Sequence, residues 1–161
     1  MVDERLEARV GILLKAGGLT ICTAESCTGG LVLHRLTNIS GSSAYVLGGV
    51  VAYSNAIKQA ILRVSEASLI QYGAVSEQVA REMAHHVREL FGADIAVGVT
   101  GIAGPGGGTP EKPVGLTYIG LSHKGSGEVV QRFVWDGDRE TIKAASAQAA
   151  LQMVIDSLDR A

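Results

Sequence analysis

A lysine and several hydroxyl side chains lie close together in one stretch of the sequence, and together they could supply a nucleophile and its general base. Ser43 belongs to the segment 41–45, and Lys58 follows the polar run 53–55. A lysine that is partly buried can lose its proton, and a neutral amine is a general base. We therefore predict that Lys58 activates Ser43 in a Ser-Lys arrangement of the kind that recurs on unrelated folds.

Other residue assignments remain open at this point. Ser54 is a rival nucleophile because it stands four residues before Lys58, and Ser26 is another because it begins a helix. Taken alone, Lys58 would more often be a solvated helix lysine. We place Tyr53 and Asn55, which flank Ser54, among the substrate-binding residues.

The segment 23–30 has the form of a strand that ends in a polar turn and then starts a helix. Unpaired backbone N–H groups at such a turn can hold an anion, and glycines let a ligand approach the backbone. An equally good interpretation is that a hydroxyl simply caps the helix. We predict a substrate-binding role for Ser26, Thr28, Gly29 and Gly30.

The segment 100–109 is rich in glycine and follows a predicted buried strand, where α/β proteins bind ligands. It has neither the Gly-Lys-Ser/Thr of a Walker loop nor the spacing of a dinucleotide fingerprint, so ATP and NAD lose support. Its later part, 105–113, could equally be a disordered surface loop. We predict that Thr100 is catalytic and that the following residues bind substrate: Gly101, Ile102, Ala103 and Gly104.

Arg139 starts the last predicted helix, where the helix dipole disfavours a cation, so we expect an anion nearby. The four histidines are scattered, and we predict no metal and no cofactor. Cys22 and Cys27 do not form the framework of a secreted domain, and we expect reduced thiols.

Hydrophobic periodicity and turn residues predict an α/β fold: a single-domain three-layer sandwich, with a mixed β-sheet covered by helices on both faces. The predicted helices are 6–14, 27–36, 55–62, 65–71, 76–90 and 139–158. The predicted strands are 19–23, 45–53, 94–99, 114–122 and 128–135, the last two forming a hairpin.

Composition narrows the classes of partner. The chain has 161 residues, enough for one domain over 1–161. A net charge of -2 makes nucleic acid a poor partner, and we expect no membrane partner because no apolar run approaches the ~18 to 20 residues of a spanning helix. The N-terminus does not have the pattern of a secretory signal, which favours a cytoplasmic protein. An apolar fraction of 47% favours a homo-oligomer.

Several motifs together closely resemble the CinA C-terminal domain family, over nearly the whole chain. The matching segments are 23–30, 41–43, 53–55 with Lys58, 73–77, 100–105, 112–115 and 137–139. The resemblance implies nicotinamide-nucleotide amidase activity: nicotinamide mononucleotide and water give nicotinate mononucleotide and ammonia, in pyridine nucleotide salvage. Some members carry an additional N-terminal domain, and this chain looks like the stand-alone form.

The resemblance also implies roles for individual residues. It assigns the nucleophile to Ser43, the base to Lys58, and supporting roles to Thr100 and Arg139. Amide hydrolysis needs such a nucleophile, a base and donors for the oxyanion, and we expect the segment 26–30 to bind the phosphate. Two alternatives remain: a regulatory module that binds a pyridine nucleotide without hydrolysing it, and a hydrolase of another small amide.

Overall fold

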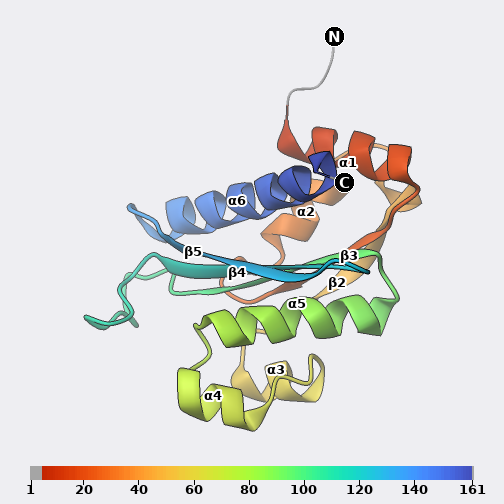
Figure 1. Cartoon of the computed structure of the whole chain (residues 1–161). Coiled ribbons are helices and arrows are strands. Elements are labelled where there is room, and N and C mark those ends of the chain that lie inside the picture. The colour runs from red at the N-terminus through yellow and green to blue at the C-terminus, as the bar shows by residue number, and fades with distance from the viewer. Residues whose placement is uncertain (1–4, 161) are drawn as a thin grey trace.

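One mixed sheet forms the centre of the molecule (Figure 1). It has five strands in the order β2-β1-β3-β4-β5. The computed structural model describes residues 5–160. β1, β2 and β3 run parallel, whereas β4 and β5 pair antiparallel as a hairpin. The strands are β1 Ile21–Glu25, β2 Val46–Val51, β3 Ile95–Gly101, β4 Leu116–His123 and β5 Gly127–Val134.

Helices cover both faces of this sheet, which confirms the predicted single-domain α/β sandwich (Figure 1). One face is covered by α1 Leu6–Gly17, α2 Leu31–Thr37 and α6 Arg139–Asp159. The other is covered by α5 Glu77–Phe91, with α3 Asn55–Ala60 and α4 Glu66–Tyr72 beyond it. A short 3-10 helix, Ser42–Ala44, precedes β2. No helix in residues 5–160 is both long and apolar enough to cross a membrane.

The sequence of α5 shows why this helix forms and where it packs. Ser76 caps it, because its hydroxyl accepts a hydrogen bond from the backbone N–H of Val79 at 3.3 Å. Val79, Met83 and Val87 recur at helical spacing and are fully buried against the sheet. Each such side chain contributes about 1.5–3 kcal/mol on burial.

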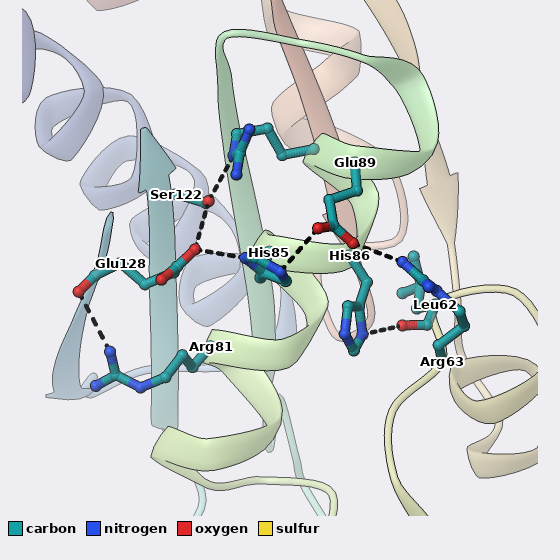
Figure 2. A network of polar contacts seen from close by, with 9 residues as sticks. Leu62, Arg63, Arg81, His85, His86, Glu89, Ser122 and Glu128 are labelled. Atoms are coloured by element: carbon teal, nitrogen blue, oxygen red, sulfur yellow. Dashed lines mark hydrogen bonds and ion pairs between the residues drawn. The ribbon is translucent and has the colours of Figure 1, made fainter. Parts of the chain in front are cut away.

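A polar network joins α5 to β4 and β5 (Figure 2). His85 contacts a carboxylate oxygen of Glu128 at 2.6 Å, and Ser122 donates to the same oxygen at 2.9 Å. His85 also pairs with Glu89, which binds Arg63 at 2.7 Å in the loop after α3. The network therefore fixes α5 against its neighbours, and we assign it a structural role.

The predicted helix 27–36 begins later than expected, at Leu31. Gly29 and Gly30 have φ values of 61° and 101°, in the left-handed region that glycine tolerates best. The preceding strand, in turn, continues to Glu25 rather than ending at Thr23. The polar turn between β1 and α2 is therefore a separate segment, 26–30, held at the edge of the sheet.

Candidate active site

The carboxyl ends of β1, β2 and β3 meet at one edge of the sheet because these strands are parallel. Ser26 directly follows β1, and Lys58 lies on the short helix that follows β2. The Lys58 ammonium donates hydrogen bonds to the Ser26 hydroxyl and to the backbone carbonyls of Ala52 and Tyr53, each at 3.0 Å. The structure thus pairs Lys58 with Ser26.

Burial gives this lysine unusual chemistry. Lys58 is 2% exposed and Ser26 is 7% exposed. Burial disfavours the charged form and lowers the Lys58 pKa from its ordinary value of 10.5, with no carboxylate hydrogen-bonded to the ammonium in residues 5–160. Once neutral, the amine can keep both carbonyl contacts and point its lone pair at the Ser26 hydroxyl. The pair therefore has the geometry of a serine nucleophile and its general base.

Glu25 holds the turn that carries Ser26. This buried carboxylate accepts hydrogen bonds from the Thr28 hydroxyl at 2.7 Å and from the backbone N–H groups of Val32 at 2.9 Å and Leu33 at 3.1 Å. These are N–H groups of the first turn of α2. Glu25 therefore already occupies these two N–H groups, which lie just after the segment 26–30 that we expect to bind the phosphate.

The predicted pairing of Ser43 with Lys58, which the family resemblance also implied, is wrong. Ser43 precedes β2 and Lys58 follows it, so the two residues lie at opposite ends of this strand. A strand of this length spans about 17–20 Å. Ser43 lines a different cavity, formed with α2 and the start of β2. The other rival, Ser54, caps α3 by accepting a hydrogen bond from the backbone N–H of Ile57 at 3.2 Å.

A cavity of about 190 Å³ opens in front of the Ser26–Lys58 pair. Several sequence-predicted residues line it together, as expected: Tyr53, Asn55, Thr100, Gly101, Ala103 and Arg139. Cys27, Ala74 and Val75 complete the wall.

The side chains of Thr100 and Arg139 already have protein partners. Thr100 is buried, and its hydroxyl donates to the backbone carbonyl of Ala74 at 2.8 Å. Arg139 donates to the carbonyl of Gly104 at 2.7 Å and to the hydroxyl of Tyr53 at 3.1 Å. Arg139 thus joins two walls of the cavity, and the anion that we expected beside it is not a carboxylate of residues 5–160.

The glycine-dense segment after β3 contributes less than predicted. Gly101 and Ala103 line the cavity, but Ile102 and Gly104 do not. The backbone N–H of Ile102 donates to the Leu116 carbonyl at 2.9 Å. Gly101 is closely packed, because a Cβ there would lie 2.8 Å from the backbone oxygen of Leu116. This segment therefore forms a rigid wall.

The cysteines offer no competing nucleophile. Burial raises the pKa of Cys27 to about 11 and that of Cys22 to about 12, so both thiols stay protonated near neutral pH. Both are free, as predicted. Within residues 5–160, no group of histidine, cysteine, aspartate and glutamate side chains is arranged to hold a metal.

The remaining predicted residues line a second, larger cavity of about 440 Å³. Thr28, Gly29 and Gly30 form one wall, and Lys143 and Glu140 of α6 lie opposite. The two cavities flank the same turn.

Comparison with known proteins places the chain in a family. A family model described as the CinA C-terminal domain matches residues 3–158. The chain belongs to this family. A nicotinamide-nucleotide amidohydrolase, PncC, of Enterobacter agglomerans is 48% identical over 152 residues, which cover 94% of this chain and 93% of that protein. This confirms the resemblance seen in the sequence motifs.

Longer relatives and solved structures agree with this placement. A Moorella thermoacetica protein named for competence-damage induction is 53% identical over 156 residues, which cover 97% of this chain but only 37% of that protein. The chain thus spans little more than a third of that relative. The crystal structure of the competence/damage inducible protein CihA from Agrobacterium tumefaciens is 42% identical with a TM-score of 0.92, covering 96% of this chain and 93% of that chain.

Proposed function

We propose that this CinA-family chain hydrolyses the carboxamide of nicotinamide mononucleotide, giving nicotinate mononucleotide and ammonia. The observation that carries the proposal is the buried hydrogen bond between Lys58 and Ser26 at 3.0 Å. Two further observations support it: the cavity in front of this pair, and the name of the PncC relative of nearly equal length.

In the first half of the proposed reaction, the Ser26 oxygen attacks the amide carbon while neutral Lys58 takes the hydroxyl proton. The carbonyl oxygen becomes an oxyanion. The Lys58 ammonium then gives its proton to the amide nitrogen, the C–N bond breaks, and ammonia leaves. Ser26 is left as an ester of the nicotinate group.

In the second half, a water molecule attacks this ester and Lys58 again takes the proton. Collapse of the second tetrahedral intermediate returns the proton to Ser26 and releases the carboxylate product. The carbonyls of Ala52 and Tyr53 hold the Lys58 nitrogen in place in both halves. This fixed position lets a single amine serve as base and acid in turn.

The oxyanion needs hydrogen-bond donors close to Ser26. The backbone N–H groups of Cys27 and Thr28 directly follow the nucleophile, and neither donates to a backbone carbonyl in residues 5–160. We assign the oxyanion to them. The Thr100 hydroxyl hydrogen is directed at Ala74, so Thr100 shapes the cavity in this scheme.

Tyr53 and Asn55 lie at the mouth of the cavity, on the segment that follows β2. Tyr53 is 66% exposed, and its hydroxyl accepts the hydrogen bond from Arg139. An exposed aromatic ring held in this way can stack on the flat pyridine ring of the substrate. We propose this role for Tyr53.

The test compares ammonia release from nicotinamide mononucleotide, nicotinamide riboside and free nicotinamide. The proposal predicts release from the nucleotide with the highest kcat/KM of the three. Binding of the nucleotide without ammonia release would instead favour a regulatory module. Faster release from a different small amide would keep the chemistry and change the substrate.

We also retain the proposal that the chain forms a homo-oligomer. Large apolar side chains are exposed along β2 and the segment after it: Leu47, Val51, Tyr53, Ile57 and Ile61. Light scattering coupled to size-exclusion chromatography would give the mass in solution, and a monomer at micromolar concentration would contradict the proposal.

A further inference from the structure

The larger cavity beside the active site contains a lysine that has no hydrogen-bonding or ion-pair partner among residues 5–160. Lys143 lies on α6 and makes no hydrogen bond or ion pair with any residue of 5–160, although it is only partly exposed. An unpaired ammonium that faces a cavity is suited to an anionic ligand group.

The cavity wall opposite Lys143 leaves space for such a group. The Lys143 nitrogen lies 3.6 Å from the point where a Cβ on Gly29 would be, so any side chain at Gly29 would fill the space before the ammonium. Gly29 also has a φ of 61°, which other residues adopt at a cost. The backbone therefore approaches the ammonium closely.

This cavity and the catalytic one lie on either side of the same turn. The backbone N–H of Gly29 donates to the Ser26 carbonyl at 3.1 Å, which closes a tight turn and keeps the two Cα atoms within about 7 Å. On α6, Arg139 lines the catalytic cavity and Lys143, one helical turn later, lines its neighbour. The turn 26–30 and helix α6 thus line both cavities.

The catalytic cavity alone is small for a nucleotide. Its volume is about 190 Å³, below the roughly 300–1,000 Å³ of common small-molecule sites, whereas the neighbouring cavity has about 440 Å³. In a pyridine mononucleotide, a ribose separates the reacting ring from the phosphate. A ligand whose amide lies at Ser26 must therefore extend beyond the first cavity.

We infer that the cavity between Gly29 and Lys143 binds the 5'-phosphate of the nucleotide, and that Lys143 makes this enzyme select nucleotides over nucleosides. The inference rests on the proposed function for the identity of the substrate. It keeps the phosphate beside the segment 26–30 and adds the Lys143 side chain as its cation, because Glu25 occupies the N–H groups of Val32 and Leu33.

Two other polar side chains, Glu140 and His34, line this cavity. Glu140 is exposed on the same wall and opposes an anion, and the His34 side chain of α2 also lines the cavity. Glu140 and Lys143 form no ion pair. Removing the Glu140 charge should therefore strengthen phosphate binding, and removing the Lys143 charge should weaken it.

The kinetic test uses Lys143→Gln, with Lys124→Gln in the β4–β5 turn as the matched control. We expect Lys143→Gln to lower kcat/KM for nicotinamide mononucleotide by about tenfold or more, mainly through KM, and to leave kcat/KM for nicotinamide riboside within about twofold. Glu140→Gln should lower KM for the nucleotide. Equal losses for both substrates, or no loss for either, would overturn the inference.

A binding measurement separates this inference from the proposed function. Nicotinate mononucleotide and nicotinate riboside carry no amide, so their affinity can be measured by calorimetry without turnover. Lys143→Gln should weaken binding of the first compound and not of the second. If wild-type protein releases no ammonia but shows this pattern, the proposed function fails and the phosphate site stands. Unchanged nucleotide affinity would overturn the phosphate site alone.

Discussion

Replacement of Lys58 by methionine tests whether this lysine is a catalytic base or a structural cation. Methionine keeps the length and apolar character of the side chain but removes the amine. A positioned general base contributes about 10²- to 10⁴-fold to kcat, and we expect a loss of that size. The stability change follows from three lost hydrogen bonds, worth about 1 kcal/mol each, so the free energy of unfolding should fall by at most ~3 kcal/mol.

Removal of the buried charge offsets part of that loss. Burial lowers the Lys58 pKa, which means that the folded state pays to keep the ammonium charged. The variant should therefore remain folded, as a urea titration followed by circular dichroism would show. Ammonia release measured on the same preparation then reports catalysis alone.

A double variant tests whether Ser26 and Lys58 act together in catalysis. If Ser26 and Lys58 act as one unit, Ser26→Ala combined with Lys58→Met should be no less active than the weaker single variant. Activity of folded Lys58→Met within about tenfold of wild type would refute the role of the lysine. Multiplied losses in the double variant would refute the shared role.

Three further predictions concern pH and stability. Because Lys58 is the base when neutral, kcat/KM should rise with pH through an apparent pKa below 10.5 and then level off, as initial rates across pH 6–11 would show. Glu25→Ala leaves four donors without an acceptor, so a urea titration should show a loss of about 1–3 kcal/mol for each donor that stays buried and unpaired, and kcat should fall because Ser26 is displaced. Asp94→Ala removes the two hydrogen bonds from Thr20 and should also cost about 1–3 kcal/mol.

The shifted pKa values of Asp94 and Lys58 fix how the free energy of unfolding changes with pH. The hydrogen bond from the backbone N–H of Thr20 holds the Asp94 pKa below 3.8, so its stabilising contribution is present above pH 3.8 and lost as pH falls through the lowered value. For Lys58, the unfolded chain binds the proton more tightly, so stability should rise with pH up to 10.5. Asp136→Ala, at an exposed residue, is the control for Asp94 and should leave stability within about 0.5 kcal/mol.

Local pattern was sufficient to predict most of the fold. The spacing of Val79, Met83 and Val87 predicted α5, and the polar run 124–127 predicted the β4–β5 hairpin; both are confirmed. The start of α2 was predicted wrongly, because hydroxyls in the segment 26–30 resemble helix caps while the actual acceptor is Glu25. A carboxylate inside the strand before the turn gives no local capping pattern.

Predicting the catalytic pair requires the order of the strands in the sheet as well as the sequence. Ser43 and Lys58 are close along the chain, and both this short separation and the family resemblance favoured their pairing. Ser26 and Lys58 are far apart in sequence but follow the carboxyl ends of β1 and β2, which are neighbours in the sheet. That rule for parallel strands could have pointed to Ser26, provided that β1 and β2 were known to be adjacent.

The most direct test of the account measures ammonia release from nicotinamide mononucleotide by wild-type protein, Ser26→Ala and Ser43→Ala. Each variant removes one serine hydroxyl, but only the hydroxyl of Ser26 lies within hydrogen-bonding distance of Lys58. The account predicts turnover by the wild type, turnover by Ser43→Ala within about twofold of it, and a loss of several orders of magnitude in Ser26→Ala. Full activity in Ser26→Ala, or loss of activity in a folded Ser43→Ala, would contradict it.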